Sequence, residues 1–196
     1  MRRTHLLVEG QTEEAITREV LVPCLECPGH WLSWSVLAST RQSSGAKVRG
    51  GVTTWEKIHR DVRELLRDTS IDVLTTMFDY YGMPADTPGM STRPSGGPRD
   101  RVGHVESAMA TAVASRRFRP HLTLRETETW VFAAAGVLDE HFGELGLGER
   151  VADVARGAGG PELVDDGPHT APSKRLTQMC PSYRKVADGL ATIRRA

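Results

Sequence analysis

Short apolar runs alternate with amphipathic segments along the first two thirds of the chain. A continuous run of β-branched and apolar residues is typical of a strand that is buried on both faces of a parallel sheet. The run "IDVLTTMF" shows this pattern most strongly. The pattern predicts four strands, over residues 4–8, 32–38, 71–78 and 121–124.

Between these runs, apolar residues recur at the spacing of one helix face. The spacing predicts helices over residues 12–21, with Pro23 beyond the end, and from residue 100 to about 116. A further helix is expected near Thr53, which matches a capping box with Glu56. The stretch "TRQSSGAKVRGG" and the Pro- and Gly-rich residues 80–98 are predicted to be loops.

Strands that alternate with helices predict an α/β fold, with a mostly parallel sheet flanked by helices. After about Gly136 the pattern changes to short helices, broken by "RGAGGPE" and "DDGPHTAPS". We therefore expect a single domain over residues 1–196, with a core at about 1–135 and a helical C-terminal cap at about 136–196. A chain of 196 residues is long enough to bury such a core.

The overall charge does not indicate a polyanionic partner, because 25 Lys and Arg residues balance 25 Asp and Glu residues. A surface for nucleic acid would have to come from local clusters of basic residues. The apolar run after Arg2 and Arg3 is too short for a signal peptide or a membrane span. With 3 cysteines a disulfide framework is not expected, so we predict a cytoplasmic protein that makes no membrane contact.

The cysteines also allow a zinc site, which we weigh here. Cys24 and Cys27 form a C-x-x-C pair, His30 follows, and Cys180 is a possible fourth ligand. Half a zinc site at this spacing is a weak signal, so buried or incidental thiols are the favoured interpretation. A redox pair is not expected, because the two cysteines follow the predicted C-terminal end of a helix. The negative end of the helix dipole disfavours a thiolate there.

Carboxylates follow the ends of three predicted strands. Glu9 follows the first strand, Asp79 the third, and Glu126 and Glu128 the fourth. In open parallel sheets, ligands bind beyond the carboxyl ends of the strands. Two like charges about 4 Å apart repel by about 4 kcal/mol at an effective dielectric constant near 20. A divalent cation reverses this effect, and oxygen ligands favour Mg²⁺ or Mn²⁺. The four residues are therefore candidate catalytic residues of a metal site.

Each carboxylate also has a purely structural explanation. Glu9 can be a turn residue or a charge at a helix N-terminus. Asp79 can open a loop by binding the backbone of its own turn. Glu126 and Glu128 can lie on a solvated strand edge and point to opposite faces. Only the coincidence of the four positions favours the metal site.

Basic residues and a glycine are candidates for binding phosphate. Gly10 allows a sharp turn, after which the backbone N–H groups of a helix lie near a bound phosphate. Lys174 and Arg175 lie at a predicted helix start in "PSKRL", with Lys185 further along, and Arg offers a bidentate fork. Their alternative is a solvated helix face. Three tyrosines either stack on bases or belong to the core, namely Tyr80, Tyr81 and Tyr183.

The stretch "LLVEGQTEE" resembles the first motif of the TOPRIM superfamily, in which a glutamate at a strand end and a glycine lead into a helix. Further pieces, in order, are "TTMFDYYGMP", "RETETWVFA", "APSKRL" and "CPSYRK". Together they make nearly the entire chain similar to a bacterial TOPRIM-like family, the domain of unknown function 4276. The first motif is shared with several families, whereas the combination is specific.

The resemblance implies a TOPRIM-type α/β core with a catalytic Mg²⁺ site. Glu9 corresponds to the motif glutamate and Asp79 to the first acid of the second motif. The second motif is usually Asp-x-Asp, and Tyr81 stands here at the second acid. Glu126 or Glu128 is a candidate replacement from the next strand, so the expected metal ligands are Glu9, Asp79 and Glu128.

The resemblance also bears on partners, because relatives often occur beside ABC-type ATPases in bacterial defence loci. By analogy it implies an ATPase partner and a role against phage. We thus expect a Mg²⁺- or Mn²⁺-dependent nuclease acting on DNA or RNA. The alternative is a catalytically degenerate TOPRIM-like module that docks on the ATPase without cleaving nucleic acid.

Overall fold

The computed structural model describes residues 1–37, 54–124, 128–164 and 171–195, without the side chains of residues 185–188. The chain divides into two compact units. The first comprises Met1–Thr17 and Leu21–Leu124, and the second comprises Arg18–Val20 and Arg125–Ala196. That the two units form a single domain stays a prediction.

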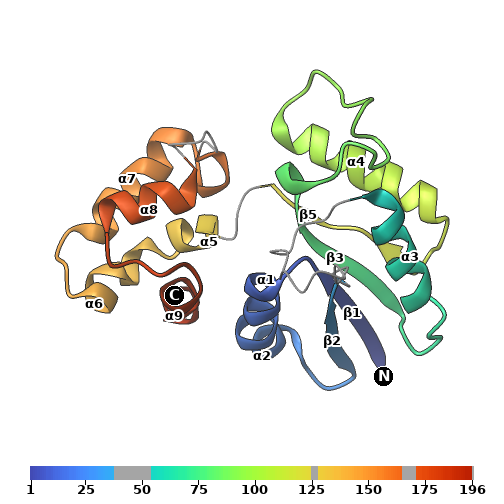
Figure 1. The fold of residues 1–196 in the computed structure, drawn as a ribbon. Coiled ribbons are helices and arrows are strands. Elements are labelled where there is room, and N and C mark those ends of the chain that lie inside the picture. Colours follow the sequence, from blue (N-terminus) through green and yellow to red (C-terminus); the bar gives the residue numbers. More distant parts are fainter. Residues whose placement is uncertain (38–53, 125–127, 165–170, 196) are drawn as a thin grey trace, which may run out of the picture. The chain divides into compact units, whose positions relative to one another are not determined.

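The first unit contains a parallel sheet, which confirms the predicted α/β class (Figure 1). Strand β1 (Arg2–Val8) lies between β2 (His30–Val36) and β3 (Val73–Asp79). Beyond β3 the sheet continues with the short strands β4 (Phe118–Arg119) and β5 (Leu122–Thr123), and every pairing is parallel. The strand order β2-β1-β3-β4 leaves β2 at one edge.

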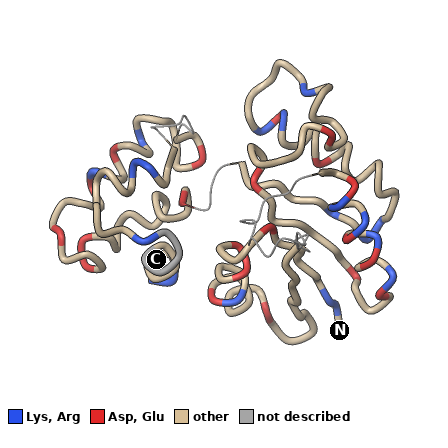
Figure 2. Tube along the Cα trace, in the orientation of Figure 1, with Lys and Arg blue, Asp and Glu red and all other residues tan. Residues whose placement is uncertain are grey.

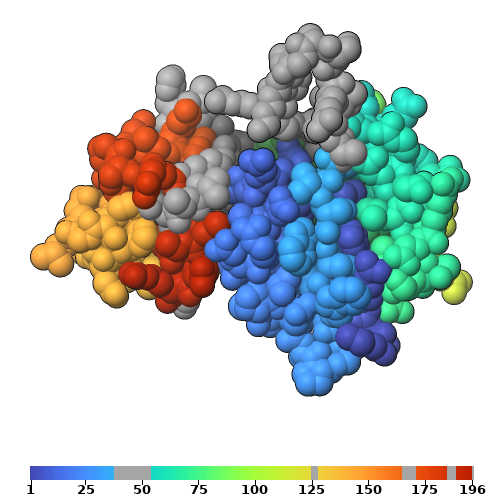
Figure 3. Space-filling view, turned by 60° about the horizontal axis from the view of Figure 1, so that its bottom comes forward, coloured from blue at the N-terminus to red at the C-terminus, as the bar shows by residue number. Residues whose placement is uncertain are grey.

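Helices flank both sides of this sheet (Figure 1). On one side, α1 (Gln11–Ile16), a π-helical turn (Thr17–Leu21) and α2 (Val22–Leu25) follow β1. In Figure 3 these segments lie beside β2, in shades of blue. The other side is covered by α3 (Trp55–Leu65) and α4 (Pro98–Val113).

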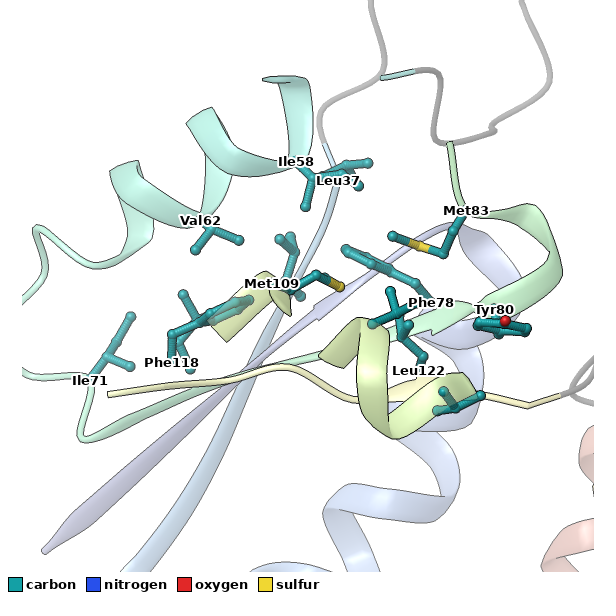
Figure 4. Packing of buried hydrophobic residues seen from close by; sticks show 14 residues of the cluster. Leu37, Ile58, Val62, Ile71, Phe78, Tyr80, Met83, Met109, Phe118 and Leu122 are labelled. Carbon is teal, nitrogen blue, oxygen red and sulfur yellow. The ribbon is translucent and has the colours of Figure 1, made fainter. Parts of the chain in front are cut away.

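The main core lies between the sheet and the pair α3 and α4 (Figure 4). Ile58 and Val62, four residues apart on α3, are completely buried, as a helical apolar stripe predicts. Leu7 of β1 belongs to this cluster. Its neighbours Leu6 and Val8 point to the opposite face and are buried outside the cluster, on the side of α1.

The first helix runs further than predicted. Pro23 does not lie beyond its end but within α2, and the helical path continues to Leu25. A π-turn precedes the proline, with the N–H of Val22 bound to the carbonyl of Thr17. This wider turn lets the chain accept a residue that lacks an N–H and would clash with the preceding turn of an α-helix.

The start of α3 also differs from the predicted capping box. Thr54 is the N-cap residue and makes no side-chain cap hydrogen bond, and Thr53 lies outside the described residues. The N–H of Trp55 donates instead to the Asp86 carboxylate, at 3.1 Å to each oxygen. Asp86 comes from the loop after β3, so a distant residue replaces the local cap. The predicted loop "TRQSSGAKVRGG" lies outside the described residues.

The last predicted strand is interrupted and begins earlier than expected, at Phe118. Between β4 and β5, the Thr76 hydroxyl donates to the carbonyl of His121 (2.8 Å) and lies 2.9 Å from the N–H of the same residue. The Glu106 carboxylate of α4 accepts the N–H of Leu122 at 2.8 Å. Pro120 has no N–H to donate to the ladder, and side chains hold the chain here instead.

The second unit is built of short helices with a core of its own, and it includes the predicted C-terminal helix. The helices begin at Glu128, earlier than the predicted position near Gly136. They are α5 (Glu128–Ala133), α6 (Leu138–Phe142), α7 (Leu147–Ala158), α8 (Pro172–Met179) and α9 (Lys185–Arg195), with 3₁₀ turns at Ala135–Val137 and Pro161–Leu163. None of the described helices is long and apolar enough to cross a membrane.

Asp139 fixes the turn before α7. Its carboxylate accepts the N–H of Gly148 at 2.6 Å and that of Gly146 at 2.7 Å, and these bonds hold the pKa of Asp139 below its usual value. Gly148 lies so close to the carbonyl of Ala135 that a Cβ atom there would collide with the oxygen. The glycine therefore allows the tight contact between α7 and the preceding 3₁₀ turn.

Edge strand β2 is protected by a side chain. The N–H of Leu32 donates to Glu26 Oε1 at 3.3 Å rather than to β1. Glu26 lies in the turn between α2 and β2. One outward-facing N–H group of the edge is thus already bound within the chain.

Candidate functional site

Two of the predicted acidic residues meet at the carboxyl end of the sheet. β1 and β3 are parallel neighbours with Val8 opposite Met77, so their carboxyl ends reach the same edge. Glu9 directly follows β1, and Asp79 is the last residue of β3. The backbone N–H of Asp79 donates to Glu9 Oε2 at 3.3 Å. Residues 70 positions apart in the sequence are therefore in direct contact.

The Asp79 side chain also shapes the turn that follows. Its Oδ1 atom accepts the N–H of Tyr81 at 3.0 Å and caps the 3₁₀ turn Tyr80–Gly82. This bond is the loop-opening role that the sequence offered as the structural explanation. The two roles are compatible, because a carboxylate has two oxygen atoms and about four acceptor positions.

Gly82, which the sequence analysis did not single out, lies next to both acids. A Cβ atom at this position would be 3.7 Å from Asp79 Cβ and 3.9 Å from each carboxylate oxygen of Glu9. A larger side chain at this position would therefore extend from within contact of both acids. The available signal was its place three residues after Asp79, in the turn that leaves the strand.

Gly10 does not adopt the sharp turn that was predicted. Its backbone is extended (φ −156°, ψ −166°), a conformation open to any residue. A Cβ atom on Gly10 would be 3.4 Å from Glu13 Oε2, so a third carboxylate group lies close to it. The phosphate-binding role of Gly10 stays a prediction.

Of the other two predicted acids, Glu126 lies outside the described residues. Glu128 was predicted to follow the end of the last strand, but it begins α5 in the second unit. It is only 3% exposed, which also excludes the alternative of a solvated strand edge. The chain has left the sheet by this point, and Glu128 shares a buried helix face with Phe132, four residues on. Its role as a metal ligand stays a prediction.

The predicted phosphate-binding side chains belong to the second unit. Lys174 is exposed and Arg175 is half-buried on α8, where Pro172 is the first helical residue. Lys185 begins α9, and its side chain lies outside the described part. Their contribution to a phosphate site stays a prediction. Figure 2 shows basic and acidic positions interspersed along both units.

The acidic pair fits the donor set of a hard divalent ion. Mg²⁺ is typically bound through one or two carboxylates together with waters and substrate phosphates. Glu9 and Asp79 supply two such carboxylates, and Gly82 beside them has no side chain. In the described residues, no group of three or more His, Cys, Asp or Glu side chains is placed to hold a metal ion.

The cysteines show no zinc site within the described residues. Cys24 and Cys27 are exposed, whereas Cys180 is buried in the second unit. His30 Nε2 forms a 3.0 Å hydrogen bond with the Thr4 hydroxyl, and its Nδ1 lies 3.2 Å from the carbonyl of Leu25. Both ring nitrogens of His30 thus hold the start of β2.

The three tyrosines differ in their exposure. Tyr80 (2% exposed) and Tyr183 (8%) are core residues of the first and second units, respectively. Tyr81 is 50% exposed and lies in the turn beside the acidic pair. The sequence left both interpretations open for all three residues, and the structure separates them.

Comparison with known proteins gives a family but no activity. A protein-family model matches residues 8–196, and its description is Domain of unknown function (DUF4276). The match covers nearly the whole chain, including Glu9 and Asp79. No curated protein and no solved structure matches the chain.

Proposed function

The chain belongs to the family described as Domain of unknown function (DUF4276), and from its site we propose that it is a metal-dependent nuclease that hydrolyses phosphodiester bonds in DNA or RNA. The observation that carries the proposal is the contact between Glu9 and the backbone of Asp79 at the carboxyl end of the sheet. This is the place at which open parallel sheets bind ligands. Like charges repel each other, and a divalent cation bound between two carboxylates offsets that repulsion.

In the proposed mechanism, Glu9 and Asp79 hold Mg²⁺ or Mn²⁺. The ion supplies polarisation of the phosphodiester, activation of a water molecule and shielding of the leaving oxygen. Glu9 is oriented by the N–H of Asp79, which fixes one of its oxygens. Gly82, which has no side chain, would let a phosphate group approach the acids. As an alternative role, Glu9 acts as general acid or base.

The proposal includes a TOPRIM-type core. Its support is the parallel sheet with Glu9 after the first strand and Asp79 at the end of β3, as the motifs "LLVEGQTEE" and "TTMFDYYGMP" imply. Tyr81 stands where the second motif usually has its second acid. Glu126 and Glu128 remain the candidate replacements. The ABC-type ATPase partner and the role in anti-phage defence come from the same resemblance.

The test is a cleavage assay with the full chain on end-labelled single-stranded DNA, double-stranded DNA and RNA. Each substrate is incubated with Mg²⁺, with Mn²⁺ or with EDTA. Glu9→Gln and Asp79→Asn keep the size of each side chain and remove its charge. We expect them to lower the cleavage rate by about 100-fold, the upper end of what is lost when a partner of a metal ligand is removed.

The matched control is Glu64→Gln, which removes an exposed carboxylate of α3 that pairs with Arg67. It is expected to cleave at the wild-type rate. Wild-type cleavage by both Glu9→Gln and Asp79→Asn would show that the active site lies elsewhere.

A second candidate function is a non-catalytic module that docks on the ATPase and binds nucleic acid. It is favoured by Tyr81 in place of the second acid. Titration calorimetry with Mn²⁺ discriminates between the two functions. The nuclease is expected to bind Mn²⁺ in a manner that depends on Asp79. A binding module is expected to show no such dependence and to bind nucleic acid equally well after Asp79→Asn.

A further inference from the structure

Tyr81 combines strong exposure with a fixed position at the edge of the acidic pair. Its backbone N–H donates to Asp79 Oδ1 at 3.0 Å. Its ring packs edge-to-face on the ring of Tyr80, with centroids 5.1 Å apart and an interplanar angle of 80°. The side chain nevertheless remains 50% exposed. The ring is thus held by a neighbouring aromatic side chain, and half of the Tyr81 side chain is in contact with solvent.

We infer that Tyr81 is the base-stacking residue of a subsite for single-stranded nucleic acid beside Glu9 and Asp79. The inference rests on the proposed function, because it names the substrate class of the same site. It also gives a reason for a tyrosine at the position where a second acid was expected.

The backbone of Tyr81 lies beside the acidic pair. Its N–H donates to Asp79 Oδ1, and the next residue is Gly82, whose Cβ position would be 3.9 Å from each carboxylate oxygen of Glu9. Adjacent Cα atoms are about 3.8 Å apart, so the Tyr81 side chain starts one residue away from this contact. In the inferred subsite, a nucleotide whose phosphate is held at the acids stacks its base on the Tyr81 ring.

The support for this ring is rigid. Tyr80 is 2% exposed and belongs to the main core, where Figure 4 shows it near Leu122. The buried Tyr80 side chain thus anchors the turn in the core, while Asp79 binds the backbone N–H of Tyr81. A stacking residue that is already ordered loses little conformational entropy when a base binds.

A positive charge lies near the same pair of rings. Arg93 Nη1 donates to the Tyr80 hydroxyl at 3.4 Å, and the arginine is otherwise exposed. A guanidinium group has five N–H donors, of which this bond uses one. The loop from the 3₁₀ turn to α4 therefore offers an aromatic face and a phosphate-binding fork together.

Stacking on Tyr81 requires an unpaired base. Within a duplex, both faces of an internal base are covered by its neighbours, whereas a base in a single strand has a free face. Base–aromatic stacking tolerates any sequence, because every base has a π-face. The subsite is therefore expected to prefer single-stranded over duplex nucleic acid, without a preference for sequence.

Trp31 is a matched control within the same unit. It is 44% exposed, similar to Tyr81, but it lies near the amino-terminal end of β2. The guanidinium carbon of Arg3 lies 5.0 Å from the centre of its ring, so a side chain of the protein already covers it. Removing Trp31 tests whether any exposed aromatic ring would have the same effect.

The experiment measures binding by fluorescence anisotropy with the full chain and an end-labelled oligonucleotide of about 12 nucleotides, within the range of single-strand binding sites. The same sequence as a duplex is measured in parallel. We expect Tyr81→Ala to raise the Kd for the single strand about tenfold and to leave the Kd for the duplex within about twofold. Tyr81→Phe, which keeps the ring, and Trp31→Ala are expected to bind like the wild type.

Three outcomes overturn the inference. In the first, the wild type binds no single strand. In the second, Tyr81→Ala binds it as tightly as the wild type does. In the third, Tyr81→Ala weakens duplex binding by the same factor.

The cleavage assay separates this failure from that of the proposed function. If Tyr81→Ala still cleaves in a metal-dependent manner with unchanged strand preference, the subsite is wrong and the proposed nuclease activity stands. If the wild type never cleaves but Tyr81→Ala selectively loses single-strand binding, the proposed nuclease activity is wrong and the subsite is supported.

Discussion

At the amino-terminal end of the sheet, Arg3 and Arg117 bind acceptor groups, whereas at the carboxyl-terminal end Glu9 and Asp79 bring two acids together. Arg3 Nη1 lies 2.8 Å from Asp68 Oδ2 and 2.7 Å from the Ser70 hydroxyl. The first arrangement pairs a positive charge with acceptor groups, which stabilises the fold, whereas the second places two like charges on neighbouring strand ends. The proposed function assigns binding to this second end of the sheet.

The largest expected effect concerns Arg117, at the stabilising end. Its guanidinium donates to the carbonyls of Asp68 and Ile71, each at 2.8 Å, and to that of Leu66. Arg117→Ala should lower the free energy of unfolding by about 3 kcal/mol, because three carbonyls lose a charged donor. Urea denaturation measures this change. Arg116→Ala, at the exposed neighbouring position, should change it by less than about 0.5 kcal/mol.

The second prediction concerns the stability of the acidic end. Mn²⁺ at about 100 times its Kd should stabilise the wild type by about 2.7 kcal/mol. Glu9→Gln and Asp79→Asn should show little stabilisation, and without metal they should be at least as stable as the wild type, because one like charge is gone. Thermal unfolding with Mn²⁺ and with EDTA measures both effects. Equal stabilisation of all three proteins would place the metal elsewhere.

The third prediction tests the space above the acids. Gly82→Leu should weaken Mn²⁺ binding about tenfold, since its side chain extends toward oxygens that a Cβ alone would approach to 3.9 Å. Gly82→Ala is the milder control, because its Cβ contacts would be ordinary. Calorimetric titration gives the affinities. If Gly82→Leu binds Mn²⁺ like the wild type, the ion does not occupy this space.

The smallest effect is a dependence on pH at the amino-terminal end. Hydrogen bonds from Ser70, together with Arg3, hold the pKa of Asp68 below its usual value of 3.8. A depressed pKa adds stability above the unfolded value, and this stability is lost as the pH falls through the lower folded value. The stability difference between wild type and Asp68→Asn should thus be present at neutral pH and vanish in acid. Urea denaturation over this pH range checks the sign.

Hydrophobic runs were sufficient to predict the sheet and the meeting of Glu9 with Asp79. Each acid ends an apolar run, and parallel strands deliver their carboxyl ends to one edge. The interrupted last strand and the Asp86 cap of α3 were not predictable from local periodicity. They depend on bonds between residues far apart in sequence, such as Thr76 with His121 and Asp86 with Trp55.

The prediction failed for Glu128 for a related reason. Glu128 was placed after the last strand because it closely follows an apolar run, but it begins α5 and shares a buried helix face with Phe132. The sequence also could not tell which tyrosine is buried, because Tyr80 and Tyr81 are adjacent and yet one is buried and the other is exposed. Gly82 was missed because its role depends on which side chains lie opposite to it, and that follows only from the fold.

The bond from Leu32 to Glu26 has a consequence for how copies of the chain behave in a crowded solution. An open border of a sheet is a template on which strands of other molecules can add, which leads to aggregation. Glu26 occupies one N–H of that border and places a carboxylate next to it. Self-association through strand addition therefore has to displace an internal bond and approach a negative charge, so Glu26 disfavours strand addition at this edge.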